Sequence, residues 1–115
     1  MQPGDLELSV HRCGASVLVR LTGELDLATR ELLDALLDPL LQRSARPVVR
    51  RLVVDCAELT YLDASGLTPL LHARAVLGRR GGTVELRAVP PPAHRVLEVL
   101  GLADQLLGNG APTAR

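Results

Sequence analysis

The spacing of the apolar residues changes along this chain of 115 residues, and that change limits the folds open to it. In Leu6–Val10 and again in Ser16–Leu21, apolar and polar residues alternate, which is the period of a β-strand with one buried face. Gly14 lies in the short segment between the two runs, where a tight turn is needed. The beginning of the chain is therefore predicted to form a β-hairpin.

A helical period replaces this alternation between residues 28 and 41. Apolar residues there recur at intervals of three and four, which predicts a single buried stripe made of Leu33, Leu36, Leu37, Leu40 and Leu41. Asp26 or Thr29 is placed to cap the start of this helix. Pro39 has no N–H to donate, so we expect either a kink there or an end of the helix near Leu37.

The remainder of the chain alternates strands and helices. Arg51–Asp55 is the most strand-like run and is predicted to be central in a sheet, and Leu67–Leu77 is predicted to be a helix. Thr83–Val89 is the next predicted strand, and a third helix begins at Pro91 and ends at Gly101. The order β-β-α-β-α-β-α predicts an α/β fold with a mixed four-stranded sheet. Its first strand is antiparallel, the next three are parallel, and the helices pack mainly on one face.

Composition indicates one domain over residues 1–107, followed by a Gly-, Pro- and Ala-rich tail over residues 108–115 that we expect to be disordered. Leu and Val must fill the core, because the chain has one tyrosine and no Phe or Trp. Acidic and basic residues are equal in number, which argues against direct binding to nucleic acid or to a membrane surface. We find no signal segment and no membrane-spanning run, and so we expect a cytoplasmic protein.

The segment Leu62–Leu67, with the sequence LDASGL, places Ser65 at a turn between a predicted strand and a predicted helix. A helix N-terminus presents unpaired N–H groups and a partial positive charge, so a phosphate on this serine is compatible with the helix. Two starts of the helix are open. Either Ser65 caps it, which we favour, or Thr68 caps it and Pro69 is its first residue.

The element order, Gly23-Glu24-Leu25-Asp26, the segment Leu62–Leu67 and the ending Gly101-Leu102 together resemble the STAS domain family over residues 6–107. Within it, the chain is similar to the bacterial anti-sigma factor antagonists. The resemblance implies a STAS-like fold and a regulatory protein that is not an enzyme.

This resemblance also implies a cycle of partner switching. The unphosphorylated antagonist binds an anti-sigma factor that is also a serine kinase of the ATP-binding histidine-kinase-like fold, which frees a sigma factor. The kinase then phosphorylates the antagonist and binding is lost, until a phosphatase restores it. Carried over, Ser65 is the phosphoacceptor, Asp26 and Asp63 are the acidic positions beside it, and Ala64, Gly66 and Leu67 complete the partner-binding segment. A homodimer is compatible with this family.

Purely structural roles are also open for three of these residues. Ser65 could only cap a helix, Asp63 could only bond N–H groups of its own turn, and Asp26 could only cap the preceding helix. The protein would then be a non-switching STAS scaffold or a ligand-sensing module.

Enzyme, cofactor and metal chemistry find no support in the sequence. His72 lies about 10 Å of helix beyond Ser65, too far for a triad with Asp63. Residues 78–82 lack the lysine and hydroxyl of a phosphate-binding loop. The histidines and cysteines have no metal-ligand spacing, and we expect Cys13 and Cys56 to be reduced, partly buried thiols.

Overall fold

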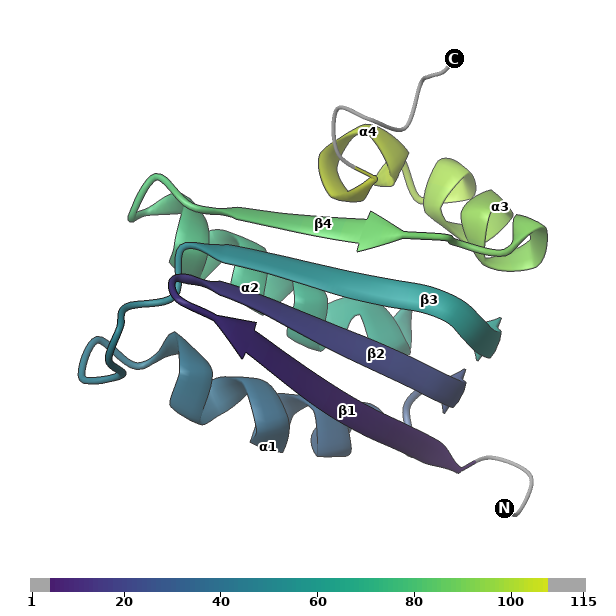
Figure 1. The fold of residues 1–115 in the computed structure, drawn as a ribbon. Coiled ribbons are helices and arrows are strands. Elements are labelled where there is room, and N and C mark those ends of the chain that lie inside the picture. The colour runs from purple at the N-terminus through teal and green to yellow at the C-terminus, as the bar shows by residue number, and fades with distance from the viewer. Residues whose placement is uncertain (1–4, 108–115) are drawn as a thin grey trace.

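The computed structural model of the protein describes residues 5–107. One sheet contains, in spatial order, β1 (Leu6–Cys13), β2 (Ser16–Leu25), β3 (Arg51–Leu62) and β4 (Thr83–Arg87) (Figure 1). The helical segments are α1 (Arg30–Leu41), the 3-10 turn η1 (Ser65–Leu67), α2 (Thr68–Gly78), α3 (Pro91–Val99) and α4 (Ala103–Leu106). β1 is antiparallel to β2, while β2, β3 and β4 are parallel, which confirms the predicted mixed sheet. The predicted tail lies outside the described residues.

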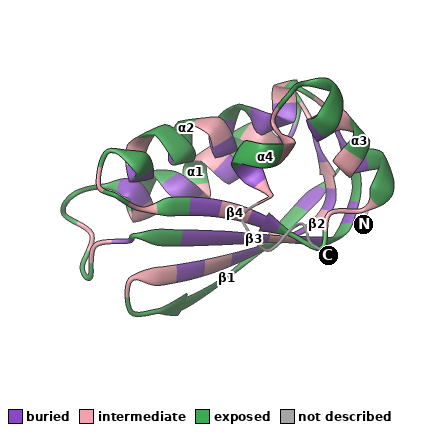
Figure 2. Cartoon of the chain, turned by 90° about the horizontal axis from the view of Figure 1, so that it is seen from above, coloured by how far each residue is buried: buried purple, intermediate pink, exposed green. Residues whose placement is uncertain are grey.

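α1 and α2 cover the same face of the sheet (Figure 2). The inward side chains of β2 alternate with outward ones, so that Val17, Val19 and Leu21 are buried while Arg20 between them is exposed. Leucines of the helices complete this core, among them Leu33, Leu37, Leu70 and Leu77. Leu and Val therefore fill the interior, as the composition predicts.

Three strands run further than predicted. β1 continues past Val10 to Cys13, where the hairpin closes. β2 and β3 are longer because their pairing continues after the alternation is interrupted. β2 ends at Leu25 rather than Leu21, and β3 ends at Leu62 rather than Asp55. Register shifts between these two strands break the regular pattern of apolar residues, yet Leu25 still pairs with Leu62. The extension carries both strands to the turn that contains Ser65.

The other element ends differ from prediction for local reasons. α1 passes through Pro39 to Leu41, because Pro39 is exposed while Leu37 and Leu41 anchor the helix in the core. β4 ends at Arg87 rather than at Val89, because Ala88 adopts a left-handed φ of 54° that leaves the extended conformation.

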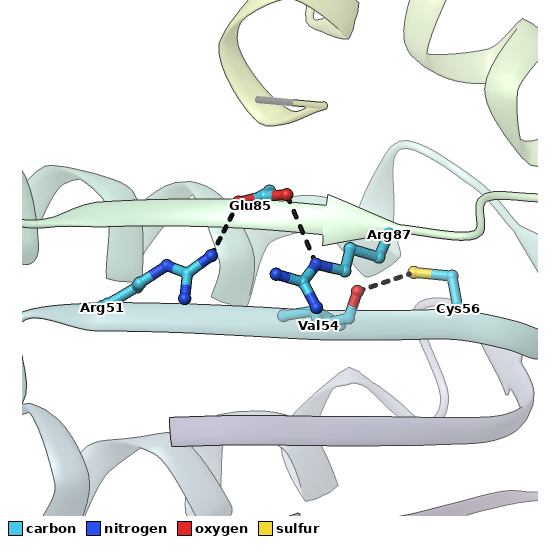
Figure 3. A network of polar contacts seen from close by, with 5 residues as sticks. All are labelled: Arg51, Val54, Cys56, Glu85 and Arg87. Carbon is cyan, nitrogen blue, oxygen red and sulfur yellow. Dashed lines mark hydrogen bonds and ion pairs between the residues drawn. The ribbon is translucent and has the colours of Figure 1, made fainter. Parts of the chain in front are cut away.

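The sheet face opposite α1 and α2 carries ion pairs between neighbouring strands and one ion pair within β4. Nε of Arg20 on β2 lies 3.2 Å from Oδ2 of Asp55 on β3. Glu85 pairs with both Arg51 and Arg87 at 3.4 Å (Figure 3). The N–H of Ala57, and after it Arg20, lowers the pKa of Asp55, although partial burial opposes them.

We expect Asp55→Asn to make the protein less sensitive to acid. Because the pKa of Asp55 is lowered in the folded state, its charge stabilises the fold above its unfolded pKa of about 3.9, and this contribution disappears as the pH falls through the folded value. Urea unfolding at pH 7 and pH 3 should therefore differ less in the variant, by less than about 1 kcal/mol. Glu7→Gln, on the exposed surface of β1, is the control. An unchanged pH dependence in Asp55→Asn contradicts the prediction.

The two cysteines have different surroundings. Cys13 is exposed and Cys56 is buried, and both are free thiols. The prediction that both are partly buried is thus wrong for Cys13, which closes the hairpin at the exposed end of β1. Burial, and after it the charge of Asp55, raises the pKa of Cys56 to about 12.

Alkylation of the native protein is expected to modify Cys13 and spare Cys56. At pH 8 a thiol of pKa about 12 is only ~0.01% thiolate, and burial also blocks the reagent. Mass spectrometry after iodoacetamide treatment should find one modification in the native protein, two in urea, and none in native Cys13→Ser. Rapid modification of Cys56 in the native protein would contradict its burial.

Candidate functional site

The segments predicted to carry function meet at one edge of the sheet. β2 and β3 are parallel and end as the pair Leu25 and Leu62, so Asp26 and Asp63 leave the sheet side by side. The N–H of Asp63 lies 3.4 Å from the carbonyl oxygen of Leu25 and donates to it. The structure therefore brings together the two acidic residues that are 37 positions apart in the sequence.

Asp63 closes the turn that carries Ser65. Its Oδ1 accepts a hydrogen bond from the N–H of Gly66 at 3.0 Å, and its Oδ2 accepts one from the hydroxyl of Tyr61 at 3.2 Å. The bond to Asp63 raises the pKa of Tyr61, because ionisation would remove the donor and set two negative charges together. The predicted alternative that Asp63 bonds its own turn is confirmed.

Ser65 begins a helical path without capping it. η1 starts at Ser65, and α2 starts three residues later at Thr68, with Pro69 in its first turn. In the part of the chain described, residues 5–107, the hydroxyl of Ser65 makes no hydrogen bond, because the carboxylate of Asp63 already takes the capping position. The favoured prediction that Ser65 caps the helix is therefore wrong, and its hydroxyl is not held by a hydrogen bond to any of residues 5–107. The alternative cap, Thr68, is itself the first residue of α2.

The main-chain N–H groups after Ser65 are occupied. Gly66 donates to Asp63, Leu67 donates to the carbonyl of Ala64 at 3.2 Å, and Thr68 donates to the carbonyl of Ser65. From the sequence alone, these N–H groups are expected to be unpaired and able to bind a phosphate, and the structure contradicts this expectation. A phosphate on Ser65 would thus project from the surface rather than be held by the helix N-terminus.

Asp26 and Thr29 fix the loop before α1. Oδ1 of Asp26 accepts from the N–H groups of Ala28 and Thr29, both at 3.0 Å. In return, the hydroxyl of Thr29 accepts from the N–H of Asp26 at 3.0 Å and donates to the carbonyl of Glu24 at 2.7 Å. Thr29, which is buried, therefore takes the N-cap position of α1, but neither its side chain nor that of Asp26 bonds an N–H of the helix, so the predicted side-chain cap is wrong. Asp26 instead fixes the turn that leads into α1.

Thr29→Val is expected to lower the free energy of unfolding by about 2 kcal/mol, because the N–H of Asp26 loses its acceptor in a part-buried position. Thr22→Val, the same replacement on the half-buried outer surface of β2, should cost far less. Urea unfolding measures both. Equal costs would mean that the network around Asp26 contributes nothing to stability.

Two structural roles here were not visible in the sequence. Gly66 lies against the end of β2, and a Cβ placed on it would be 2.3 Å from the carbonyl oxygen of Leu25. Nη1 of Arg30, at the start of α1, lies 3.4 Å from the hydroxyl of Thr68 at the start of α2. No local pattern could reveal either contact, because each joins segments about 40 residues apart.

The sequence profile of the family described as "Mlab, STAS domain" matches residues 8–108. The chain belongs to the STAS domain family. This STAS domain is 32% identical over 98 residues to the anti-sigma F factor antagonist of Paenibacillus polymyxa, which covers 85% of this chain and 80% of the relative.

Solved structures share the fold of this STAS domain. The anti-sigma factor antagonist SpoIIAA in its unphosphorylated form superposes with a TM-score of 0.73 at 20% identity, covering 88% of this chain and 86% of that one. The Bacillus cell fate determinant SpoIIAA in its phosphorylated form gives 0.65 at 21% identity, covering 90% and 89%. An anti-sigma factor antagonist from Mycobacterium paratuberculosis gives 0.74 at 24% identity, covering 91% and 86%. These superpositions confirm the predicted STAS-like fold.

The surface of this STAS domain around Ser65 is partly apolar. Ala64 is exposed and Ser65 is half-buried, whereas Gly66 and Leu67 are buried beneath them and support the turn. Leu27 and Leu32, beside Asp26 and in the first turn of α1, are 61% and 50% exposed. Leu27 directly follows Asp26, which leaves the sheet beside Asp63, so one exposed leucine lies on the loop next to the Ser65 turn. Among residues 5–107 there is neither a cluster suited to a metal ion nor a helix long and apolar enough to cross a bilayer.

Proposed function

We propose that this STAS domain is an anti-sigma factor antagonist whose binding is switched off by phosphorylation of Ser65. The observation that carries the proposal is the hydroxyl of half-buried Ser65, which makes no hydrogen bond to any of residues 5–107. Its neighbours Asp26 and Asp63 hold the surrounding loops in place instead. The similarity to an anti-sigma F factor antagonist supports the same function.

A phosphate at this position acts on the surface and leaves the fold unchanged. It adds about −1.5 to −2 charges beside two carboxylates, and the N–H groups that follow are already occupied. A partner that covers Ser65 would have to desolvate this charge among like charges. Loss of binding therefore requires no rearrangement of the antagonist.

The partner of this surface is an anti-sigma factor that is also a serine kinase of the ATP-binding histidine-kinase-like fold, and a phosphatase restores the free serine. The contact would include Ala64 and Ser65 directly, with Gly66 and Leu67 holding them in position. Leu27 and Leu32 would extend it over the start of α1. The cycle takes place in the cytoplasm. The kinase supplies the phosphate from ATP, and this chain itself needs no cofactor and no direct contact with nucleic acid.

A capture experiment tests this function. Tagged wild type and tagged Ser65→Asp are incubated side by side with native lysate, and the retained proteins are identified by mass spectrometry. We expect wild type to retain a small ATP-binding kinase and Ser65→Asp to lose it. Retention of the same partner by both forms would refute the switch and would favour the non-switching scaffold.

A further inference from the structure

Five arginines line one hollow at the end of the molecule opposite Ser65. They come from the segment between α1 and β3 and from the turn after α2, and they are Arg43, Arg46, Arg50, Arg79 and Arg80. The two segments lie at the ends where β3 and β4 begin, whereas the Ser65 turn follows the far end of β3 (Figure 1). The full length of β3, 12 residues, separates the hollow from that turn.

The parallel pairing of β3 and β4 explains why the two arginine segments meet. Arg51 pairs with Thr83, so the residues before each strand become neighbours. The N–H of Thr83 donates to the carbonyl of Arg50 at 2.9 Å, and Nη1 of Arg50 donates to the carbonyl of Arg80 at 3.0 Å. Nη2 of Arg80 in turn donates to the carbonyl of Leu41 at the end of α1. Hydrogen bonds to three main-chain carbonyls, two of them donated by arginine side chains, thus hold the two segments together.

One guanidinium nitrogen in this hollow is buried without a partner. Nη1 of Arg80 is inaccessible to solvent and has no hydrogen-bond acceptor within residues 5–107. A buried charged donor that makes no hydrogen bond is costly. Arg80 lines the hollow, so a turn of its side chain toward the hollow would let a bound anion supply the missing acceptor.

Among residues 5–107, no carboxylate lines the hollow or forms an ion pair with its arginines. Its remaining lining residue is Val48, and the carboxylates that pair with arginine on the sheet pair with Arg20, Arg51 and Arg87 instead. Because the chain as a whole has no net charge, this concentration is local and cannot be attributed to a generally basic protein.

We propose that the arginine hollow binds a small soluble anion that carries two or more phosphates. Guanidinium groups bind phosphate oxygens in pairs. Arg46, Arg50 and Arg80 each use one nitrogen on a main-chain carbonyl and keep other N–H groups. Within residues 5–107, Arg43 and Arg79 keep all of theirs. In a hollow of about 560 Å³, these groups suit several phosphates in one compact ligand. The lining offers no aromatic ring for a base and little apolar surface for an acyl chain, so charge and hydrogen bonding supply the recognition. This site is independent of the function proposed for Ser65.

Titration with sodium tripolyphosphate, followed by calorimetry and by thermal unfolding, tests the proposal. Arg43 and Arg79 are exposed, and their side chains make no hydrogen bond within residues 5–107, so Arg43→Gln and Arg79→Gln should leave the fold intact. Each is expected to weaken binding about tenfold, because each removes charged hydrogen bonds to phosphate. Arg95→Gln, on the exposed surface of α3, is the matched control and should bind as wild type does. The ligand should raise the Tm of wild type and of the control.

Three results would overturn the proposal. The first is no heat and no shift of Tm for wild type at millimolar tripolyphosphate. The second is an equal loss in Arg95→Gln, which would indicate unspecific attraction. The third is tighter binding of a short DNA duplex or of phosphatidylglycerol vesicles than of tripolyphosphate, which would assign the arginines to a macromolecular or membrane surface.

Discussion

Ser65→Asp is expected to weaken binding of the captured anti-sigma factor about a hundredfold, whereas Ser65→Ala should bind as tightly as wild type. A hundredfold loss corresponds to about 2.7 kcal/mol, which is in the range expected when a charge is buried at an interface without a partner. The carboxylate of Asp63 beside the substituted residue adds repulsion. Alanine removes only a hydroxyl that bonds nothing within residues 5–107, and so the surface keeps its shape. Calorimetry on the purified pair measures all three affinities.

The matched control for this charge is Ser9→Asp, on the exposed surface of β1. It adds the same carboxylate outside the Ser65 turn and should leave the affinity unchanged. Thermal unfolding of each variant verifies that the fold is retained. Incubation with the partner and ATP should phosphorylate wild type and Ser9→Asp but not Ser65→Ala. Equal affinity for wild type, Ser65→Asp and Ser65→Ala would refute the switch, whatever partner is captured.

Much of the fold was predictable because its rules are local. The alternation in β1 and β2 and the helical stripe of α1 each follow from a repeat within a short window. The parallel order follows from the crossover helices between strands. The true ends of β2 and β3 were not predictable, because pairing of Leu25 with Leu62 maintains the strands after register shifts remove the alternation.

The site was predictable in its residues but not in its hydrogen bonds. The sequence indicated Ser65 and both acidic residues, yet it could not tell which side chain caps the turn. Asp63 and Ser65 are both able to bond the N–H groups of the turn, and in the structure Asp63 does so through Gly66. Gly66 itself packs on the end of β2, a tertiary contact that no local pattern reveals. The arginine hollow was missed for the same reason, since its two segments meet only when β3 and β4 pair.

Gly66→Ala is expected to lower the free energy of unfolding by about 3 kcal/mol and to displace the Ser65 turn. Its Cβ would lie 2.3 Å from the carbonyl oxygen and 2.6 Å from the carbonyl carbon of Leu25, and main-chain atoms of a central strand have little room to move. For a domain of this size the loss corresponds to a decrease in Tm of roughly 10–20 °C. Urea and thermal unfolding measure it. Because Ser65 precedes the glycine directly, the affinity for the anti-sigma factor should fall as well.

Gly78→Ala, in α2 directly after η1, provides the matched control. Gly78 is the last residue of α2, and a Cβ there would meet nothing within 4 Å. The same added methyl group should therefore leave stability unchanged or raise it by up to about 1 kcal/mol, as alanine favours helix. A similar cost for both variants would mean that the close packing of Gly66 on β2 is not what positions the turn. A large cost for Gly66→Ala alone would establish that the surface around Ser65 is held rigidly from below, as a switch that acts without refolding requires.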